Sequence, residues 1–159
     1  MTSKNMILRP KIALYEPDIP QNTAAIIRTC SCFDVRIEII EPCGFMLNDK
    51  RFKRVVMDYL DKKMIKFYNN YDDFFKIKNK QKERIILMTT KASDSYSNFK
   101  FNINDTILFG RESAGVPEKV HKLVNKRLKI PMSFKKRSLN LASSVAIVLS
   151  ESLRQNKLI

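Results

Sequence analysis

Three polar segments carry the residues whose types and spacing could support chemistry. In the first, "YEPDIPQNTAAIIRTC", Asn22 precedes Arg28 by six residues on a predicted helix that follows a strand. An arginine beside a strand end is suited to clamp a phosphate through two parallel N–H bonds. The alternative is a structural arginine paired with Glu16 or Glu112, and the spacing leaves both interpretations open.

The second segment, "ILFGRESAGVP", leads from a strand through a glycine-containing turn into a helix that starts at Pro117. Gly110 allows another group to approach the backbone closely, and Glu112 places a carboxylate at the sheet edge. A plain strand-to-helix turn needs one glycine at most, so two glycines around a glutamate favour a ligand site. A nucleoside triphosphate loop is excluded, because Val116 and Pro117 stand where Lys and Ser or Thr are required.

The third segment, "IPMSFKKRSLNLASSVAIVLSES", joins a cationic run to an apolar helix. Ile130 ends a predicted strand, and Ser138 or Asn140 is expected to cap the helix. The N–H groups and the dipole at a helix N-terminus favour negative charge or an acceptor nearby. The polar run is therefore predicted to bind a ligand, and the apolar helix to anchor it. An ordinary capped core helix is the alternative, but it leaves "KKRS" unexplained.

Several common chemistries are excluded by residue type. With only three glycines the chain has no G-x-G-x-x-G turn, which argues against a nicotinamide or flavin enzyme. His121 is the single histidine and is expected on the surface, so histidine triads and multi-histidine metal sites drop out. The three cysteines, Cys30, Cys32 and Cys43, form no C-x-x-C pair and suggest neither a zinc site nor a disulfide framework. No metal is expected.

The elements that must position these segments alternate between strands and helices. Strands are predicted at residues 11–15, 35–40, 64–68, 84–90, 106–110 and 127–130. Helices are predicted at residues 22–33, with Asn22 or Thr23 as N-cap, and at 50–60, 71–78, 117–124 and 139–154. This order predicts an α/β fold with a mostly parallel sheet and helices on both faces. Ligands in such sheets gather at the carboxyl ends of strands, where all three polar segments lie.

Size and charge restrict the remaining possibilities. The 159 residues are enough for one ordinary core, so residues 1–159 are expected to form a single domain. A formal net charge of +14 and a pI near 9.8 indicate attraction to a polyanion, although biased residue usage is an alternative. Two basic clusters are the best candidates for a nucleic-acid contact surface: Lys50, Arg51, Lys53, Arg54, and Lys135, Lys136, Arg137. Residues 76–84, also basic, are interpreted as a solvated connection.

No apolar run approaches the roughly 18–20 residues that a bilayer requires. The first residues, "MTSKNMILRPK", also lack the apolar region of a secretory signal. We therefore expect a cytoplasmic protein without a membrane partner.

In their order and spacing, the three segments resemble the trefoil-knotted methyltransferase superfamily, often called SPOUT. They are most similar to its branch of tRNA wobble-nucleotide ribose 2′-O-methyltransferases. The resemblance covers residues 11–155, and "EPCGFMLNDKRFKR" and "MDY" add to it. It implies a parallel sheet whose C-terminal segment is threaded into a deep trefoil knot, and a homodimer. It also implies S-adenosyl-L-methionine as methyl donor and the tRNA anticodon stem-loop, with its wobble cytidine or uridine, as substrate.

Carried over position by position, the resemblance also implies site residues. The cofactor-binding positions fall on Met88, Phe109, Gly110, Ile130, Met132, Ser138 and Leu139. The positions associated with substrate and catalysis fall on Asn22, Arg28, Glu112, Ser138 and Asn140. A guanidinium with a pKa above about 12 is a poor proton acceptor, so we interpret Arg28 as a phosphate clamp and electrostatic stabiliser.

The chain departs from its relatives at a few positions. Ala24 and Ala25 replace Gly-Asn, Ser150 replaces a frequent tyrosine, and Arg111 replaces a common proline. Two alternatives therefore stay open beside wobble-ribose methylation. One is a 2′-O-methyltransferase of another tRNA or rRNA site, and the other is a non-catalytic RNA-binding protein of the same fold.

Overall fold

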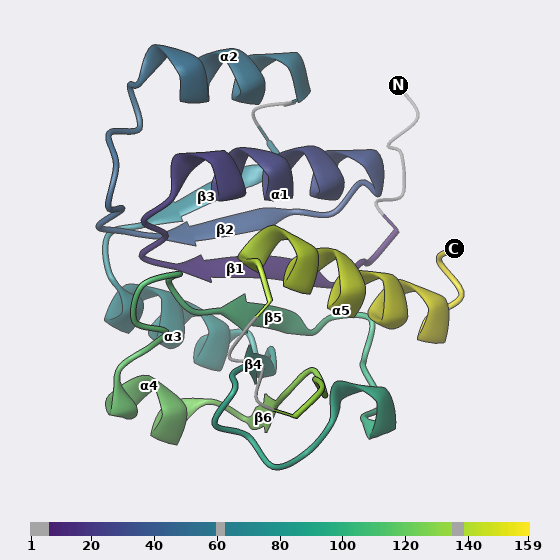
Figure 1. Cartoon of the computed structure of the whole chain (residues 1–159). Coiled ribbons are helices and arrows are strands. Elements are labelled where there is room, and N and C mark those ends of the chain that lie inside the picture. The colour runs from purple at the N-terminus through teal and green to yellow at the C-terminus, as the bar shows by residue number, and fades with distance from the viewer. Residues whose placement is uncertain (1–6, 60–62, 135–138) are drawn as a thin grey trace.

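The centre of the molecule is a parallel sheet with strand order β3-β2-β1-β5-β4-β6 (Figure 1). The computed structural model describes residues 7–59, 63–134 and 139–159. The strands are β1 (Lys11–Tyr15), β2 (Ile37–Ile40), β3 (Ile65–Tyr68), β4 (Ile85–Met88), β5 (Thr106–Phe109) and β6 (Lys126–Leu128). All four residues of β2, β4 and β5 are buried, as expected for parallel strands that helices cover on both faces.

The strand order reverses beside β1. The chain runs outward from β1 to β2 and β3, and later places β5 against the other edge of β1, with β4 and β6 beyond it. The register aligns the carboxyl ends: Leu14 pairs with Phe109, which in turn pairs with Met88. Open α/β sheets bind ligands at such a switch point. The loops that leave β1, β4 and β5 therefore meet at one edge of the sheet.

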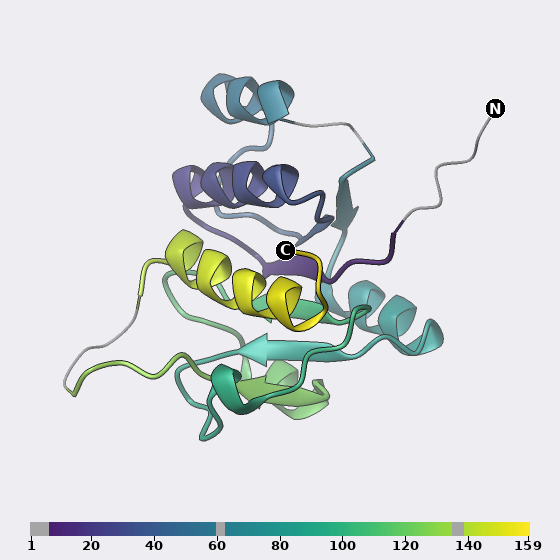
Figure 2. The ribbon, with the colours of Figure 1, turned by 90° about the vertical axis from the view of Figure 1, so that its right-hand side faces the viewer.

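Helices cover both faces of the sheet (Figures 1 and 2). They are α1 (Pro20–Cys32), α2 (Lys50–Tyr59), α3 (Tyr71–Lys80), α4 (Glu118–Leu123) and α5 (Leu141–Gln155), with a 3-10 turn, η1 (Tyr96–Asn98), between β4 and β5. α1 and α5 lie side by side on one face and α2 packs against α1, while α3 and α4 lie on the other face. This arrangement confirms the predicted fold class of a parallel sheet with helices on both faces.

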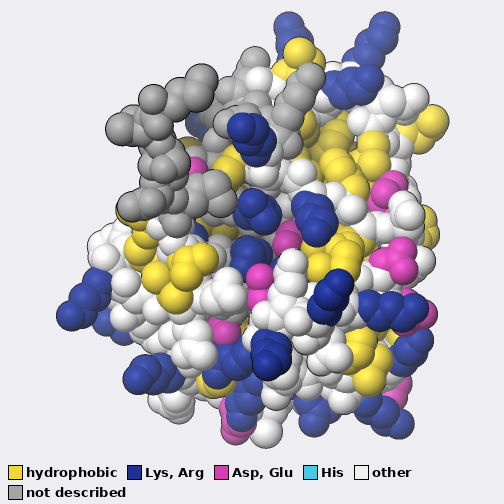
Figure 3. Space-filling view, turned by 180° about the vertical axis from the view of Figure 1, so that it is seen from behind, with side chains coloured by type: hydrophobic (Ala, Val, Ile, Leu, Met, Phe, Trp, Pro, Cys, Tyr) yellow, Lys and Arg dark blue, Asp and Glu magenta, His cyan; other side chains and the backbone are white. Residues whose placement is uncertain are grey.

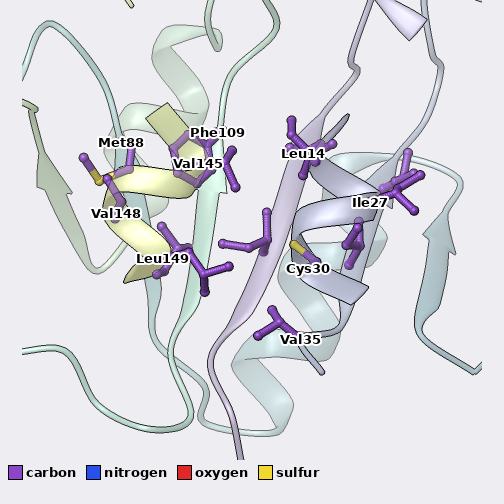
Figure 4. Packing of buried hydrophobic residues seen from close by; sticks show 14 of the residues in the cluster. Leu14, Ile27, Cys30, Val35, Met88, Phe109, Val145, Val148 and Leu149 are labelled. Atoms are coloured by element: carbon purple, nitrogen blue, oxygen red, sulfur yellow. The ribbon is translucent and has the colours of Figure 1, made fainter. Parts of the chain in front are cut away.

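α5 anchors the carboxyl ends of the central strands. Its side chains Val145, Val148 and Leu149 pack in one buried cluster with Met88 and Phe109 (Figure 4). Burying an aliphatic side chain of this size stabilises a fold by about 1.5–3 kcal/mol. The segment that precedes α5 is thereby held beside the ends of β4 and β5.

α1 begins two residues earlier than the sequence predicts. Pro20 is its first residue, and Ile19 occupies the N-cap position without a side-chain hydrogen bond. The predicted caps, Asn22 and Thr23, are therefore wrong. Proline is favoured in the first turn because its φ is already helical and the N–H that it lacks has no partner there. Asn22 then lies within the first turn, where its side chain is used for other contacts.

The predicted exposure of His121 is also wrong. The side chain is buried, because the short helix α4 packs it against the end of β4 together with Val120. Its Nε2 atom lies 3.1 Å from the hydroxyl of Thr89, and its Nδ1 atom lies 3.3 Å from the carbonyl oxygen of Pro117.

The basic stretch 76–84 is not simply a solvated connection. Its first part completes α3, and Lys78 is only 1% exposed. The Lys78 ammonium group lies 2.8 Å from Glu38 Oε2 and 2.7 Å from Glu83 Oε2. Glu83 belongs to the same stretch, five residues after Lys78, whereas Glu38 is 40 residues away and reaches Lys78 only through the tertiary fold.

Candidate active site

A cavity of about 460 Å³ opens at the carboxyl edge of the sheet, between the loops that leave β1, β4 and β5 and the segment before α5. It is lined by these residues of the sequence-predicted site: Asn22, Met88, Phe109, Gly110, Glu112, Ile130, Met132, Leu139 and Asn140. Residues that are distant in the chain, between positions 22 and 140, thus meet at one place. Their placement agrees with a common site, and their individual roles stay predictions.

The loop after β5 is closed by a tight backbone bridge. Arg111 N donates to the Gly115 carbonyl at 3.2 Å, and Gly115 N donates to the Arg111 carbonyl at 2.9 Å. A Cβ atom on Gly110 would lie 2.7 Å from the backbone of Gly115, and Gly115 itself has a φ of +63°. Both positions therefore favour glycine. The closed loop presents Glu112 toward the segment after β1.

Glu112 and Asp18 exchange reciprocal hydrogen bonds. The Asp18 backbone N–H donates to Glu112 Oε2 at 3.0 Å, and the Glu112 backbone N–H donates to Asp18 Oδ1 at 3.2 Å. The hydroxyl of Ser113 donates to Asp18 Oδ2. These bonds fix the loop after β5 against the start of α1.

The two carboxyl groups influence each other's ionisation. Burial, followed by the contact with the Asp18 side chain, raises the pKa of Glu112 above its ordinary value. The hydrogen bond with the Glu112 side chain, followed by burial acting in the opposite direction and the Ser113 hydroxyl, leaves the pKa of Asp18 below its ordinary value. When the pair holds one proton, that proton is therefore favoured on Glu112.

A line of amide groups extends from Glu112 to α5. Asn22 Nδ2 donates to Glu112 Oε1 at 3.4 Å, and Asn140 Nδ2 donates to Asn22 Oδ1 at 3.0 Å. The Asn140 Oδ1 atom accepts from Ser143 N at 3.2 Å, which confirms Asn140 as the cap of α5. Polar groups from the loops after β1 and β5 and from the start of α5 are thus joined in one network.

The opposite wall of the cavity is mainly apolar. Met88 and Phe109 are buried at the ends of β4 and β5, while Ile130, Met132 and Leu139 are more exposed. An apolar wall that faces a row of polar groups suits a ligand with a flat ring at one end and hydrogen-bonding groups at the other.

Other predicted residues lie away from the cavity or outside the described residues. Arg28 is exposed on α1 and is not among the described residues that line the cavity. Lys50, Arg51, Lys53 and Arg54 are all exposed on α2, whose Phe52 is buried. Lysine and arginine side chains project at the top of the molecule, where α2 lies, and they are scattered over the rear face (Figure 3). Lys135, Lys136, Arg137 and Ser138 lie outside the described residues.

Metal-binding clusters and membrane-spanning helices can be assessed for residues 7–59, 63–134 and 139–159. Among them, no group of three or more His, Cys, Asp or Glu side chains is arranged to hold a metal ion. None of their helices has the length and apolar composition needed to cross a membrane.

Sequence comparison assigns the family. Residues 9–150 match the sequence model of the SpoU rRNA Methylase family. The chain belongs to this family. A tRNA (cytidine(34)-2′-O)-methyltransferase of Beijerinckia indica is 45% identical over 144 residues, which are 91% of this chain and 90% of that protein. The resemblance seen in the three polar segments is thereby confirmed.

Solved structures support the family assignment of the SpoU chain. One that concerns the 2-OH methylation of C/U34 on tRNA is 32% identical and has a TM-score of 0.87, over 94% of this chain and 97% of that one. An AdoMet-bound rRNA methyltransferase of Sinorhizobium meliloti is 23% identical. It shares the fold with a TM-score of 0.82, over 92% of this chain and 56% of that one.

In this SpoU family member, the sequence analysis missed part of the cavity wall. The missed residues are Ile19, Leu87, Thr89, Thr90, Arg111, Gly115, Val116, Leu141 and Ser144. Several are sequence neighbours of a predicted residue and follow from it once the loop is placed. Asp18 was missed for another reason: it reaches the site through Glu112. The available signal was its place in "EPDIP", at the same sheet edge as Glu112.

Proposed function

We propose that the chain transfers a methyl group from S-adenosyl-L-methionine to the ribose 2′-hydroxyl of the wobble nucleotide, cytidine or uridine 34, of tRNA. The observation that carries this proposal is the 45% identity, over 91% of the chain, to a tRNA (cytidine(34)-2′-O)-methyltransferase. Membership in a methylase family supports the reaction class. The cavity at the strand ends supports the place of the reaction.

The residues of the cavity fit this methyl donor. Its volume of about 460 Å³ lies within the range of about 300–1,000 Å³ that small-molecule sites occupy. Met88, Phe109 and Leu139 would hold the adenine ring, and Gly110 would let the donor approach the backbone. When bound, the donor supplies a sulfonium methyl group that is transferred by in-line displacement without a metal. The shared fold of an AdoMet-bound family relative is consistent with this fit.

The polar side of the cavity would receive the ribose. Asn22, Glu112 and Asn140 are already joined by hydrogen bonds, so they can orient a hydroxyl without further ordering. Ser138 is proposed to act beside Asn140. Arg28, which is exposed on α1 outside the cavity wall, would clamp a phosphate of the bound RNA, and through that phosphate would favour negative charge on the reacting nucleotide. The proton would leave to a substrate phosphate or to water.

Recognition of the anticodon stem-loop is assigned to the two basic clusters. The four cations of α2 are exposed on one helix, and the second cluster is residues 135–137, near the start of α5 in the sequence. Contacts of this type read the phosphate backbone and depend strongly on salt.

The decisive experiment is incubation of the protein with labelled S-adenosyl-L-methionine and with unmodified or native tRNA, followed by nucleoside mapping. We expect label on the ribose of nucleotide 34 and the release of S-adenosyl-L-homocysteine. Label elsewhere on tRNA, or on rRNA only, would support the second candidate, which the rRNA wording of the family description favours. Cofactor binding without methyl transfer to any RNA would contradict both.

We also propose that two copies form a homodimer in the cytoplasm, where tRNA is modified. α5 supports this proposal, because Ser143, Ala146, Ile147 and Ser150 are exposed along it and most of them are small. Small residues let another helix approach closely. Sedimentation equilibrium should give the mass of two chains. A single-chain mass at micromolar concentration would contradict the dimer.

Two finer features of the fold are proposed with it. Residues 1–159 would form one SPOUT domain, and the segment before α5 would be threaded through a loop to make the trefoil knot. The six-stranded parallel sheet and the TM-score of 0.87 to a relative support the domain. A crystal structure that traces residues 129–141 continuously would test the knot, and an unthreaded path would contradict it.

A further inference from the structure

Asp18 is tied to the loop after β5 more closely than a surface aspartate needs to be. Its backbone N–H and one carboxylate oxygen bond Glu112, and its other oxygen accepts from the Ser113 hydroxyl. Asp18 is not among the described residues that line the cavity, whereas Glu112 is. Asp18 therefore acts on the cavity from outside its wall, through its partner Glu112 and its chain neighbour Ile19.

A second contact braces the same two segments. Arg111 Nη2 lies 2.7 Å from Glu16 Oε2, and Arg111 Nε donates to the Glu16 carbonyl at 3.4 Å. Glu16 has a φ of 40°, an uncommon value for a residue with a side chain. The segment after β1 is thus held at Glu16 as well as at Asp18, which fixes its register relative to Glu112.

A third segment packs directly on Asp18. Gly44 lies in the loop after β2, and its N–H donates to the Pro17 carbonyl at 2.9 Å. A Cβ atom on Gly44 would lie 2.5 Å from the Cβ of Asp18, closer than such atoms approach. Any residue with a side chain at position 44 would therefore clash with Asp18, and glycine at this position makes room for it.

We propose that Asp18 is a positioning residue for methyl transfer, which holds Glu112 and, through it, the Asn22 and Asn140 amides in the geometry that receives the ribose. This inference rests on the proposed function. Nothing in the sequence resemblance assigns a role to Asp18. The bonds from Asp18 to Glu112, to Asn22 and then to Asn140 are continuous, with distances of 3.0–3.4 Å. A small displacement at Asp18 would therefore reach the acceptor side of the cavity.

The charges around the pair provide a readout that is specific to this role. Arg111 is the charged group that lowers the pKa of Asp18, and Arg111 is itself paired with Glu16. The Asp18 side chain contributes to the raised pKa of Glu112. Removing the Asp18 carboxylate should therefore lower the pKa of Glu112, and this shift reports the contact between the two side chains independently of turnover.

The test compares Asp18→Ala and Asp18→Asn with the unmodified protein. The alanine variant removes both carboxylate contacts, and the near-isosteric asparagine variant removes the charge. We expect kcat for tRNA methylation to fall about 100-fold in Asp18→Ala and about tenfold in Asp18→Asn, because ångström-scale misplacement of a reacting group has effects of this size. The affinity for S-adenosyl-L-homocysteine should change less than about threefold in both.

Carbon-13 NMR of the Glu112 side chain supplies the second measurement. The titration midpoint of Glu112 should move to lower pH in both variants. If Asp18→Ala does not fold, Asp18→Asn decides alone. An unchanged kcat in the folded variants would overturn the proposal, even if the Glu112 titration moves. The NMR result does not require catalysis, so a protein that methylates no RNA would refute the proposed function while the placement of Glu112 by Asp18 is still tested.

Two further variants serve as a control and as an independent way to displace Asp18. Asp72→Asn is the matched control, because Asp72 is an exposed aspartate paired with Lys119 on the α3 and α4 side of the molecule. It should leave kcat and the Glu112 titration unchanged. Gly44→Ala leaves both carboxyl groups unaltered but should displace Asp18, because the added Cβ atom would clash with it. We expect kcat to fall about tenfold in this variant. Full activity in Gly44→Ala would count against the proposed sensitivity to the position of Asp18.

Discussion

Carboxylates tie distant segments of this chain together in two regions, one under α3 and one beside the cavity. Under α3, Lys78 lies between Glu38 and Glu83, and Lys11 Nζ lies 3.1 Å from Glu83. Lys78 and Glu38 are 1% and 2% exposed. At the cavity, by contrast, two carboxyl groups, Asp18 and Glu112, face each other at a partly exposed edge.

The difference separates a structural network from a site. Buried charges that alternate in sign satisfy one another, and breaking such a set is costly because a partner is left charged and unpaired. Two facing carboxyl groups gain no such attraction, and one of them has a raised pKa. An arrangement that contributes little to stability, beside a ligand-sized cavity, is typical of a functional site.

The largest expected effect comes from breaking the buried network with Lys78→Met. The substitution keeps most of the aliphatic stem and removes the charge, so Glu38 and Glu83 lose their shared cation. We expect the free energy of unfolding to fall by about 3–5 kcal/mol, measured by urea denaturation. Methyl transfer by the fraction that remains folded should be unchanged, since Lys78 lies away from the cavity.

Lys76→Met is the matched control for this prediction. Lys76 lies on the same helix, but its side chain is exposed. Its replacement should change the free energy of unfolding by less than about 0.5 kcal/mol. If both variants lost the same free energy of unfolding, the buried network would stabilise the fold no more than an exposed lysine does.

Glu112→Gln should behave in the opposite way. The substitution keeps the shape of the side chain and removes its charge, so we expect kcat for tRNA methylation to fall about 100-fold. The free energy of unfolding should change by less than about 1 kcal/mol, because the two facing carboxyl groups contribute little attraction. Turnover assays and urea denaturation of the same preparation would measure both. A large loss of stability with normal turnover would reverse the distinction between the two regions.

The sequence contained most of the fold and half of the residues that line the cavity. Short β-branched runs predicted the strands, and the loops after them predicted Asn22, Glu112 and Asn140 at one edge. These predictions depend on periodicity and on the parallel topology, both of which are local or general. The resemblance of the three segments to SPOUT enzymes supplied the cofactor positions.

The errors share a physical cause, which is that the burial and pairing of these side chains are set by the tertiary fold. His121 and Lys78 were placed on the surface because their neighbours are charged, yet α4 and α3 turn these two side chains inward. Asp18 was overlooked because its partner, Glu112, is 94 residues away. No local pattern encodes such pairings.

The exposed lysine and arginine side chains of α2 belong neither to the buried network under α3 nor to the cavity wall. Replacing Lys50, Arg51, Lys53 and Arg54 with glutamine should weaken tRNA binding about tenfold and reduce its salt dependence. Each phosphate contact that is lost lowers the slope of log K against log salt by about 0.7–0.9. Binding titrations at several salt concentrations would measure both effects.

The control for the α2 variant removes the same number of charges from exposed positions on the α3 and α4 side. It replaces Lys76, Lys80, Lys82 and Lys122 with glutamine. Affinity and slope should stay close to those of the unmodified protein. Equal weakening in the two variants would indicate attraction by net charge alone, without a defined RNA surface.

The smallest expected effect concerns the pH dependence of stability. Burial acts to raise the pKa of Glu83, but the hydrogen bonds and charges of Lys78 and Lys11 outweigh it and hold this pKa below its ordinary value of 4.5. A carboxyl group with a depressed pKa stabilises the fold above its unfolded pKa, and this contribution is lost as the pH falls through the folded pKa. The free energy of unfolding should therefore decline below about pH 4.5.

Lys78→Met should flatten that decline, because Glu83 loses its main cation and burial then favours the protonated form. Urea denaturation of Lys78→Met and Lys76→Met between pH 3 and 7 would measure the effect of the Lys78 contact, since Lys76 lies on the same helix without that contact. Parallel curves would mean that the Lys78 contact does not set the acid sensitivity of this network. The distinction between the two carboxylate regions would then rest on Glu112 alone.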